Sequence, residues 1–194
     1  SGDWVAAVQP DGKLLISSSS DGAAFVVRLT ASGASDPSFT PVGFSQGIRH
    51  LAVLPNGKII VVVWGNVSEN PIASAISTPN PTVFRLHANG QVDQSFLRPS
   101  FSPSLGLVSL FAAPVTDSAG RLYVGGRFTA VNGTGRVNIV RLLVDGNVDE
   151  SFAGSTSIPG GLAGVVRGIG IQSQSNVVVV GDLRVPSTGP TLLR

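Results

Sequence analysis

Residues 28–39 read Arg-Leu-Thr-Ala-Ser-Gly-Ala-Ser-Asp-Pro-Ser-Phe, and the same pattern returns twice later in the chain. Residues 85–96 read Arg-Leu-His-Ala-Asn-Gly-Gln-Val-Asp-Gln-Ser-Phe, and residues 141–152 read Arg-Leu-Leu-Val-Asp-Gly-Asn-Val-Asp-Glu-Ser-Phe. The aspartates at positions 36, 93 and 149 are 57 and 56 residues apart. Landmarks that keep one order and one period are the signature of a repeat protein.

A second landmark precedes each of these segments and marks a hairpin. It reads Pro-Asp-Gly-Lys at 10–13, Pro-Asn-Gly-Lys at 55–58 and Ser-Ala-Gly-Arg at 118–121, and it decays to Ser175-Asn176 in the fourth repeat. Asp-Gly and Asn-Gly favour the two-residue type I′ turn, whose central residues both need positive φ. In the first repeat this turn joins the apolar runs 4–8 and 13–16, which suit paired strands. A third strand and a short outer segment ending in Asp-x-Ser-Phe complete four predicted strands.

Four-stranded sheets repeated around an axis are the blades of a β-propeller. Runs such as 59–63 and 177–180 are apolar at every position, which predicts blades that are covered on both faces. We therefore predict an all-β, β-propeller-like fold of about three and a half four-stranded blades, an incomplete ring. It forms a single repeat domain over residues 1–194, with units at approximately 4–47, 48–107, 108–165 and 166–194.

The two landmarks together resemble the delta-sixty repeat, a β-propeller family found mainly in bacterial secreted and surface proteins. Three units carry the full pattern Arg-Leu-x-x-x-Gly-x-x-Asp-x-Ser-Phe, and the fourth carries part of it. The resemblance implies a propeller fold and an extracellular, cell-surface or periplasmic location, and it implies no activity. Residues 17–20 (Ser-Ser-Ser-Ser) depart from the family's Gly-Gly-x-Phe, which only Gly125-Gly126-Arg127-Phe128 retains.

The composition excludes several classes of protein. Only 12% of the 194 residues are charged, 42% are hydrophobic, and the formal net charge is +2, so neither disorder nor a nucleic-acid partner is expected. The chain has no Cys, which excludes a disulfide scaffold and a Cys-based zinc site. No apolar run approaches the roughly 18 residues of a membrane span. Because the chain also lacks Met and stops within a repeat, we expect a fragment of a longer chain, one of two pairing arcs, or a subunit buried against other proteins.

The recurring polar and aromatic residues are predicted to be structural. Each Phe is expected to pack between blades, and each Asp to cap its own turn or to pair with a nearby Arg. Recurrence in every unit supports this interpretation, because function in propellers tends to break symmetry. The residues concerned are Arg28, Asp36, Phe39, Arg85, Asp93, Phe96, Arg141, Asp149 and Phe152.

The connection between the second and third strands differs most between units. Variable loops on a rigid scaffold commonly carry recognition, and tolerated surface drift is the alternative interpretation. Four residues of these loops are candidates for binding: Trp64, Glu69, Arg127 and Arg136.

Two local motifs resemble catalytic or metal sites without their required context. Residues 43–47 match Gly-x-Ser-x-Gly, but a nucleophile elbow needs a helix after the turn and a strand follows here. Asp145, Asn147 and Asp149 have the spacing of a calcium loop, but the distant Glu of an EF-hand is absent and the other repeats lack the same ligands. We predict no catalytic, cofactor-binding or metal-binding residues.

These observations favour a non-catalytic exported scaffold or protein-interaction module, a structural subunit or fragment of a larger surface or extracellular assembly. Its predicted partners are other proteins or the remainder of the same chain closing the propeller. A carbohydrate-binding adhesin module, with a glycan as ligand, is the alternative, and few aromatic residues are present to serve it: Trp4, Trp64 and Tyr123. A propeller hydrolase or lyase ranks third, because the chain has only two His.

Overall fold

The computed structural model describes residues 5–20, 23–44, 47–64, 81–103, 108–153, 163–172 and 176–184. Within these ranges every regular element is a β-strand and all strand pairs are antiparallel, which confirms the predicted all-β fold. The chain divides into two compact units, residues 1–96 and 97–194. The boundaries predicted for the four repeats, and their union in one domain, stay predictions.

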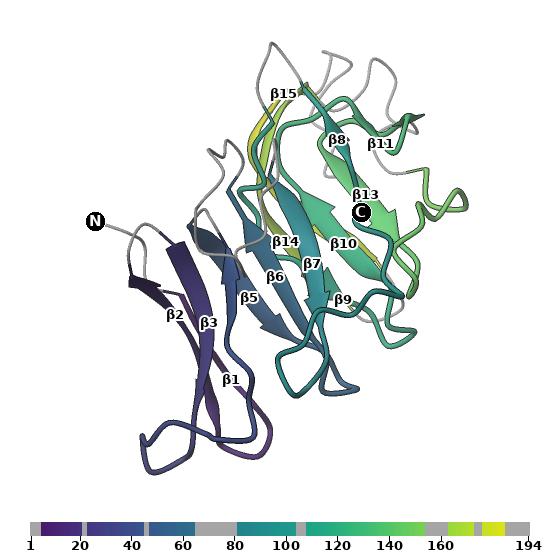
Figure 1. Ribbon diagram of the computed structural model, residues 1–194. Coiled ribbons are helices and arrows are strands. Elements are labelled where there is room, and N and C mark those ends of the chain that lie inside the picture. The colour runs from purple at the N-terminus through teal and green to yellow at the C-terminus, as the bar shows by residue number, and fades with distance from the viewer. Residues whose placement is uncertain are drawn as a thin grey trace. The chain divides into compact units, whose positions relative to one another are not determined.

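The first unit begins with a four-stranded sheet in which spatial order follows chain order. Its strands are β1 (Ala6–Val8), β2 (Leu14–Ser20), β3 (Ala23–Leu29) and β4 (Val42–Phe44). Strands β1, β2 and β3 are labelled in Figure 1. The fourth strand lies elsewhere than predicted. The outer segment makes a single bridge, from Ser35 to Leu29, and β4 comes after the Asp-x-Ser-Phe motif. The next turn begins one residue after that bridge, at Asp36, so no length remains for a ladder.

The second sheet of this unit contains β5 (Ile48–Val53), β6 (Ile59–Val63) and β7 (Thr82–Leu86) in that order. Every residue of β6 and β7 is buried, as expected for a continuous apolar run with neighbours on both faces. The cores of the two sheets merge where the rings of Phe44 and Phe84 meet, with centroids 5.0 Å apart.

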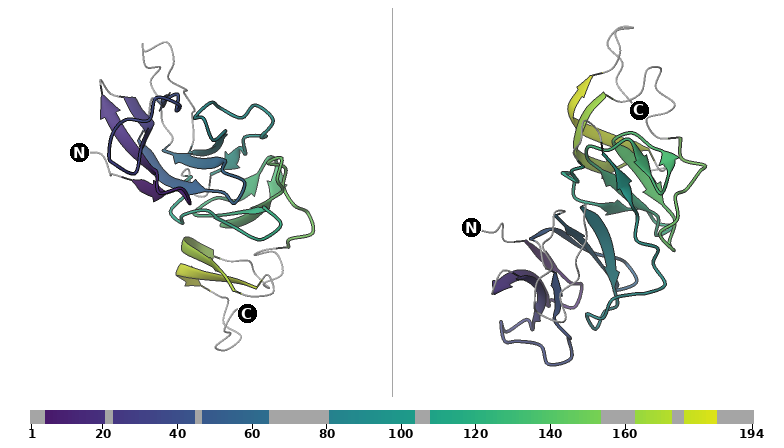
Figure 2. Two further views of the ribbon diagram at one scale, coloured as in Figure 1. Left: turned by 90° about the horizontal axis from the view of Figure 1, so that it is seen from below. Right: turned by 45° about the horizontal axis from the view of Figure 1, so that its top comes forward.

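The second unit holds two larger sheets. One has the order β13-β10-β9, with β9 at Val115–Thr116, β10 at Leu122–Gly125 and β13 at Ile139–Leu142. The other is the hairpin of β14 (Ala163–Ile171) and β15 (Val177–Arg184), which lies beside β10 (Figure 2). Gly125 makes this approach feasible, because a Cβ there would lie 2.6 Å from Val166 Cγ1. This packing explains one glycine of the Gly-Gly-x-Phe element.

A smaller sheet in the second unit joins β8 (Phe101–Ser102), β11 (Ala130–Val131) and β12 (Thr134–Gly135). The predicted variable loop of the third repeat is therefore a β-hairpin. Its turn residues Asn132 and Gly133 have φ of 50° and 78°, the positive pair that a type I′ turn requires.

The prediction of type I′ turns at the repeated Gly landmark is wrong. At 9–13 Gly12 N donates to Gln9 O and Gln9 N donates to Lys13 O, and only Gly12 has positive φ. These bonds define a three-residue loop, a type I turn followed by a left-handed glycine. Pro10 favours this outcome because its ring fixes φ near −65° at the first turn position. The same bonds recur at 30–34, 54–58, 87–91, 117–121 and 143–147.

The prediction that residues 177–180 are covered on both faces is also wrong. Val179 packs toward Ala112 and Val166, whereas Val178 and Val180 are 44% and 59% exposed. No element in the described part of the chain covers the outer side of these two valines, so the continuous apolar run is half-buried on one face and exposed on the other.

Candidate functional site

The repeated landmarks meet in one side-chain cluster at the end of the third strand. In the first repeat Arg28 Nε donates to Asp36 Oδ2 at 2.9 Å, and Arg28 Nη2 donates to Ser38 Oγ at 2.9 Å. Asp36 Oδ1 accepts from the backbone N and the hydroxyl of Ser38, so the carboxylate also closes its own turn. The Arg28 guanidinium lies 4.9 Å from the centre of the Phe39 ring. Capping and ion pairing, the two roles expected for the aspartate, are both present.

The other two repeats build the same cluster. Nε of Arg85 reaches Asp93 at 2.7 Å, and Nε of Arg141 reaches Asp149 at 2.8 Å. The guanidiniums lie 4.7 and 4.9 Å from the rings of Phe96 and Phe152. Serines 95 and 151 again donate to the carboxylate through backbone and hydroxyl. All nine predicted repeat residues therefore lie in three copies of one arrangement.

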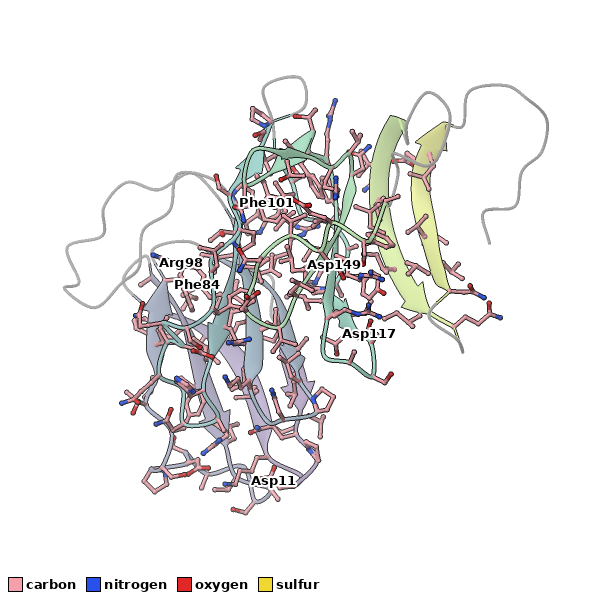
Figure 3. All side chains as sticks on the ribbon, turned by 90° about the vertical axis from the view of Figure 1, so that its right-hand side faces the viewer. Asp11, Phe84, Arg98, Phe101, Asp117 and Asp149 are labelled. Carbon is pink, nitrogen blue, oxygen red and sulfur yellow. The ribbon has the colours of Figure 1, made fainter. Side chains whose placement is uncertain are left out.

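A second cation at each aspartate was missed from the sequence. Lys13 Nζ lies 3.0 Å from Asp36 Oδ2, and Lys58 Nζ lies 2.8 Å from Asp93 Oδ2. In the third repeat Arg121 lies 3.8 Å from Asp149 and donates to Asp117 at 2.7 Å; both aspartates are labelled in Figure 3. The signal was available, because a Lys or Arg follows the glycine of the hairpin turn in all three repeats. The two landmarks recur together because they are ion-pair partners.

These contacts lower the pKa of the three aspartates. For Asp36 the main cause is the hydrogen bond from the Ser38 hydroxyl, joined by Lys13 and Arg28. For Asp93 burial raises the pKa, and hydrogen bonds from Lys58, Ser95 and Arg85 lower it by more. The same opposition leaves the pKa of Asp149 below its ordinary value. Carboxylates held ionised in this way suit structural ion pairs and not proton transfer near neutral pH.

The clusters also connect successive repeats. Within the first unit Arg28 Nη1 donates to Ala88 O at 2.6 Å, and Thr40 N donates to Asn89 O at 2.8 Å. Only a glycine at position 90 permits this close approach, because a Cβ there would lie 2.2 Å from Thr40 O. Within the second unit Leu97 N donates to Asp145 O at 2.7 Å, and a Cβ on Gly146 would lie 2.2 Å from Leu97 O. The residues after Phe39 and Phe96 thus each bind the glycine turn of the following repeat.

The structure describes three of the four candidate loop residues, each in surroundings of its own. The Trp64 ring is half-buried and stacks under the Arg49 guanidinium at 4.3 Å, and Glu69 lies outside the described residues. Arg127 is half-buried in a bridge to Ser109. Arg136 is buried, with Nη1 donating to Gly135 O at 2.8 Å.

Where the structure describes them, the motifs that resemble catalytic or metal sites lie in strands, in a local turn or in the ion-pair cluster. Ser45 lies outside the described residues, and the segments on either side of it, β4 and β5, are strands. Asp145 binds the amide of Asn147 in a local turn, and Asp149 belongs to the Arg141 cluster. Across the described ranges no three His, Cys, Asp or Glu residues gather closely enough to hold a metal. Those ranges contain no helix that is long and apolar enough to cross a membrane.

Small antiparallel sheets, linked in sequence by one recurring ion-pair cluster, define a β-propeller repeat protein. The family model for the DUF5122 β-propeller, a domain of unknown function, matches residues 9–39, 54–96 and 120–152. These segments make up more than half of the chain, and each ends at the Phe of an Asp-x-Ser-Phe motif. The chain belongs to this β-propeller family, as the delta-sixty resemblance predicted.

Comparison with individual proteins gives no further evidence on the function of this chain. One solved structure similar to this chain is a gluconolactonase from Xanthomonas campestris, at 14% identity and a TM-score of 0.35. The match covers 91% of this chain and 68% of that one. At this level of similarity neither fold nor activity is inferred from it. No curated protein sequence matches the chain.

Proposed function

We propose that this protein is a non-catalytic β-propeller scaffold that acts outside the cytoplasm and binds other proteins through uncovered sheet faces. The observation that carries the proposal is the outer side of β15, where two apolar residues of the strand, Val178 and Val180, are 44% and 59% exposed. Adjacent apolar side chains on a flat sheet face favour protein association, because water gains entropy when they are covered.

The recurring polar groups support the non-catalytic part of the proposal. The aspartates that could serve as acids or bases are each held by an Arg and a second cation. The exported location rests on the resemblance to secreted and surface proteins. The carbohydrate-binding alternative has less support, because Tyr123 is fully buried and one face of Trp64 is taken by Arg49.

The test places a photo-crosslinking residue at position 180 and, as a matched control, at position 144, where Val144 is 50% exposed in a turn. In the protein's native surroundings we expect a discrete protein adduct from position 180 and none from position 144. The adduct should disappear when Val178→Thr is added. Absence of any adduct, or turnover of glycosides or esters by the purified chain well above background, would contradict the proposal.

A further inference from the structure

Within each unit one sheet packs on the sheet of the following repeat. The sheet face that makes this contact is here named the forward face, the face that receives it is named the backward face, and equivalent faces of the other sheets carry the same names. In the first unit Leu15 of β2 lies on a forward face and packs with Leu51 and Val53 of β5, which lie on a backward face. In the second unit Gly125 of β10 lies on a forward face, against Val166 and Ile169 of β14. Forward-to-backward packing therefore occurs once in each unit.

None of the described residues covers the forward face of the β14–β15 hairpin. The turn bonds align residues 54–58 with 172–176, because Leu54 N donates to Lys58 O and Gln172 N donates to Asn176 O. Val178 and Val180 thus occupy the positions of Ile60 and Val62, each only 1% exposed. Their cross-strand partners are Gly170 and Gly168, so the two valines stand on a flat, accessible surface.

The backward face of the first sheet is likewise accessible in the part of the chain that the structure describes. Val8 and Leu14 are cross-strand partners on this face, as are Ala6 and Ile16. Val8 is 68% exposed and Leu14 and Ile16 are half-buried, whereas Leu15 on the opposite face is fully buried. In β5 the position of Val8 is taken by Val53, which packs against the core of the first unit.

A glycine turn on the first sheet is open in the same way. Gly33 and Gly90 have nearly the same φ, 85° and 91°, and the same place in the repeat. A Cβ on Gly90 would collide with Thr40 O, whereas a Cβ on Gly33 would meet nothing within 4 Å. The turn at Gly90 contacts the preceding repeat, whereas the corresponding turn at Gly33 has open space at that position.

From these observations we propose that the forward face of β14–β15 in one molecule binds the backward face of β1–β3 in a second copy, head to tail. The inference rests on the proposed scaffold function and names its partner. The two faces are the halves of a contact that the chain forms internally, and both are apolar. The neighbouring Arg167 and Asp182 pair with each other at 2.6 Å, so they place no net charge beside the forward face. A contact between two different faces is heterologous and propagates from copy to copy.

The test uses two variants that each block one face. Val8→Glu blocks the backward face and leaves the forward face intact, and Val180→Lys does the reverse. In sedimentation velocity we expect the wild-type chain to associate with rising concentration. Each variant alone should sediment as a monomer, with self-association weakened at least tenfold. An equimolar mixture should regain association, because it again supplies one wild-type forward face and one wild-type backward face.

Two controls accompany the variants. Val144→Glu changes a residue of similar exposure that lies on neither face, and it should associate like the wild type. The thermal melt of each variant shows whether it folds. If Val180→Lys impairs folding, the double variant Val178→Thr/Val180→Thr takes its place, because it keeps β-branched side chains that suit a strand.

A wild-type chain that stays monomeric up to millimolar concentration would overturn the proposal. So would a Val8→Glu variant that still self-associates, because forward faces would then bind one another, or a mixture that stays monomeric. Adducts from position 180 that contain other proteins and no second copy would refute this inference while leaving the scaffold function standing.

Discussion

Strands β6 and β15 occupy the same place in their repeats and have nearly the same residues, yet their surroundings differ. Ile60 and Val62 of β6 are each 1% exposed, whereas Val178 and Val180 of β15 are 44% and 59% exposed. The comparison shows that an unbroken apolar run predicts a strand able to be covered on both faces, and that a neighbour is needed to cover it. Covered and uncovered copies of one repeat position should therefore respond differently to the same substitution.

The largest single loss of stability is expected at the aromatic residue of the cluster. Phe96→Ala should lower the free energy of unfolding by about 4 kcal/mol, because the ring is only 5% exposed and its removal leaves a cavity. Phe152→Ala should cost about half as much, since that ring is half-buried. Chemical denaturation of both variants measures the two costs. Equal costs would mean that the burial of the ring does not determine how much it contributes to the free energy of unfolding.

The two strands themselves provide the next test. Ile60→Ala should cost about 3 kcal/mol through lost burial and an unfilled cavity. Val178→Ala, at the corresponding position of β15, should cost less, about 1 kcal/mol, because the residue is already 44% exposed. Urea midpoints at constant m-value give both numbers. Both variants are measured in dilute solution, where the chain is monomeric, and equal losses there would contradict the view that coverage sets the contribution of each side chain.

A smaller difference is expected at the glycine turns. Gly33→Ala and Gly90→Ala share the penalty of a left-handed residue with a side chain, about 1–2 kcal/mol. Gly90→Ala should cost about 1–3 kcal/mol more, because its Cβ overlaps Thr40 O and the Phe39 ring. Thermal melts of the two variants, with Gly12→Ala as a control for strain alone, measure the excess. Equal losses of stability in Gly33→Ala and Gly90→Ala would contradict the close contact between Gly90 and the preceding repeat.

The ion-pair clusters predict a pH dependence. The folded-state pKa of Asp93 lies below its ordinary value of 3.8, so the ionised carboxylate stabilises the fold above about pH 4. This contribution is lost as the pH falls from about 4 toward the lower folded-state value, because protonation then favours the unfolded chain. The melting temperature of the wild type should therefore fall on acidification below about pH 4.

Asp93→Asn isolates the contribution of this residue to the acid response. The variant should be less stable at pH 7 and should show a flatter melting profile below about pH 4. Asp149→Asn should flatten the profile less, because the second cation lies 3.8 Å from Asp149 and 2.8 Å from Asp93. Profiles that remain parallel to the wild type would exclude the clusters as the source of acid sensitivity.

Much of the fold could be predicted because the repeat displays its own constraints. The Arg, Asp and Phe of each unit recur at one spacing, since the strand, the turn and the cluster fix how far apart they lie. The hairpin type could not be predicted from Asp-Gly alone, because Asp11 can adopt negative φ and Pro10 favours that choice. The fourth strand was misplaced because pairing of 42–44 with β3 depends on the path of the chain after Phe39.

The candidate site shows the same division. Recurrence identified Arg28 and Asp36 as partners, but the role of Lys13 emerged only when the hairpin placed it over the carboxylate. The sequence predicts that Arg136 is a cation in an exposed loop, but in the structure Arg136 is buried beside the β11–β12 hairpin. Sequence spacing reports which residues are needed together, and it does not report which side of a sheet another element covers.

The sequence by itself determined the strand-forming segments, the turn positions and the ionic clusters, because each depends on residues that are local or repeat at a fixed period. The tertiary structure alone decided which apolar faces are covered. Burial depends on a neighbouring sheet and not on the residue that is buried, so Ile60 and Val178 differ despite their equivalent sequences. The uncovered faces on which the proposed assembly rests therefore became visible only in the folded chain.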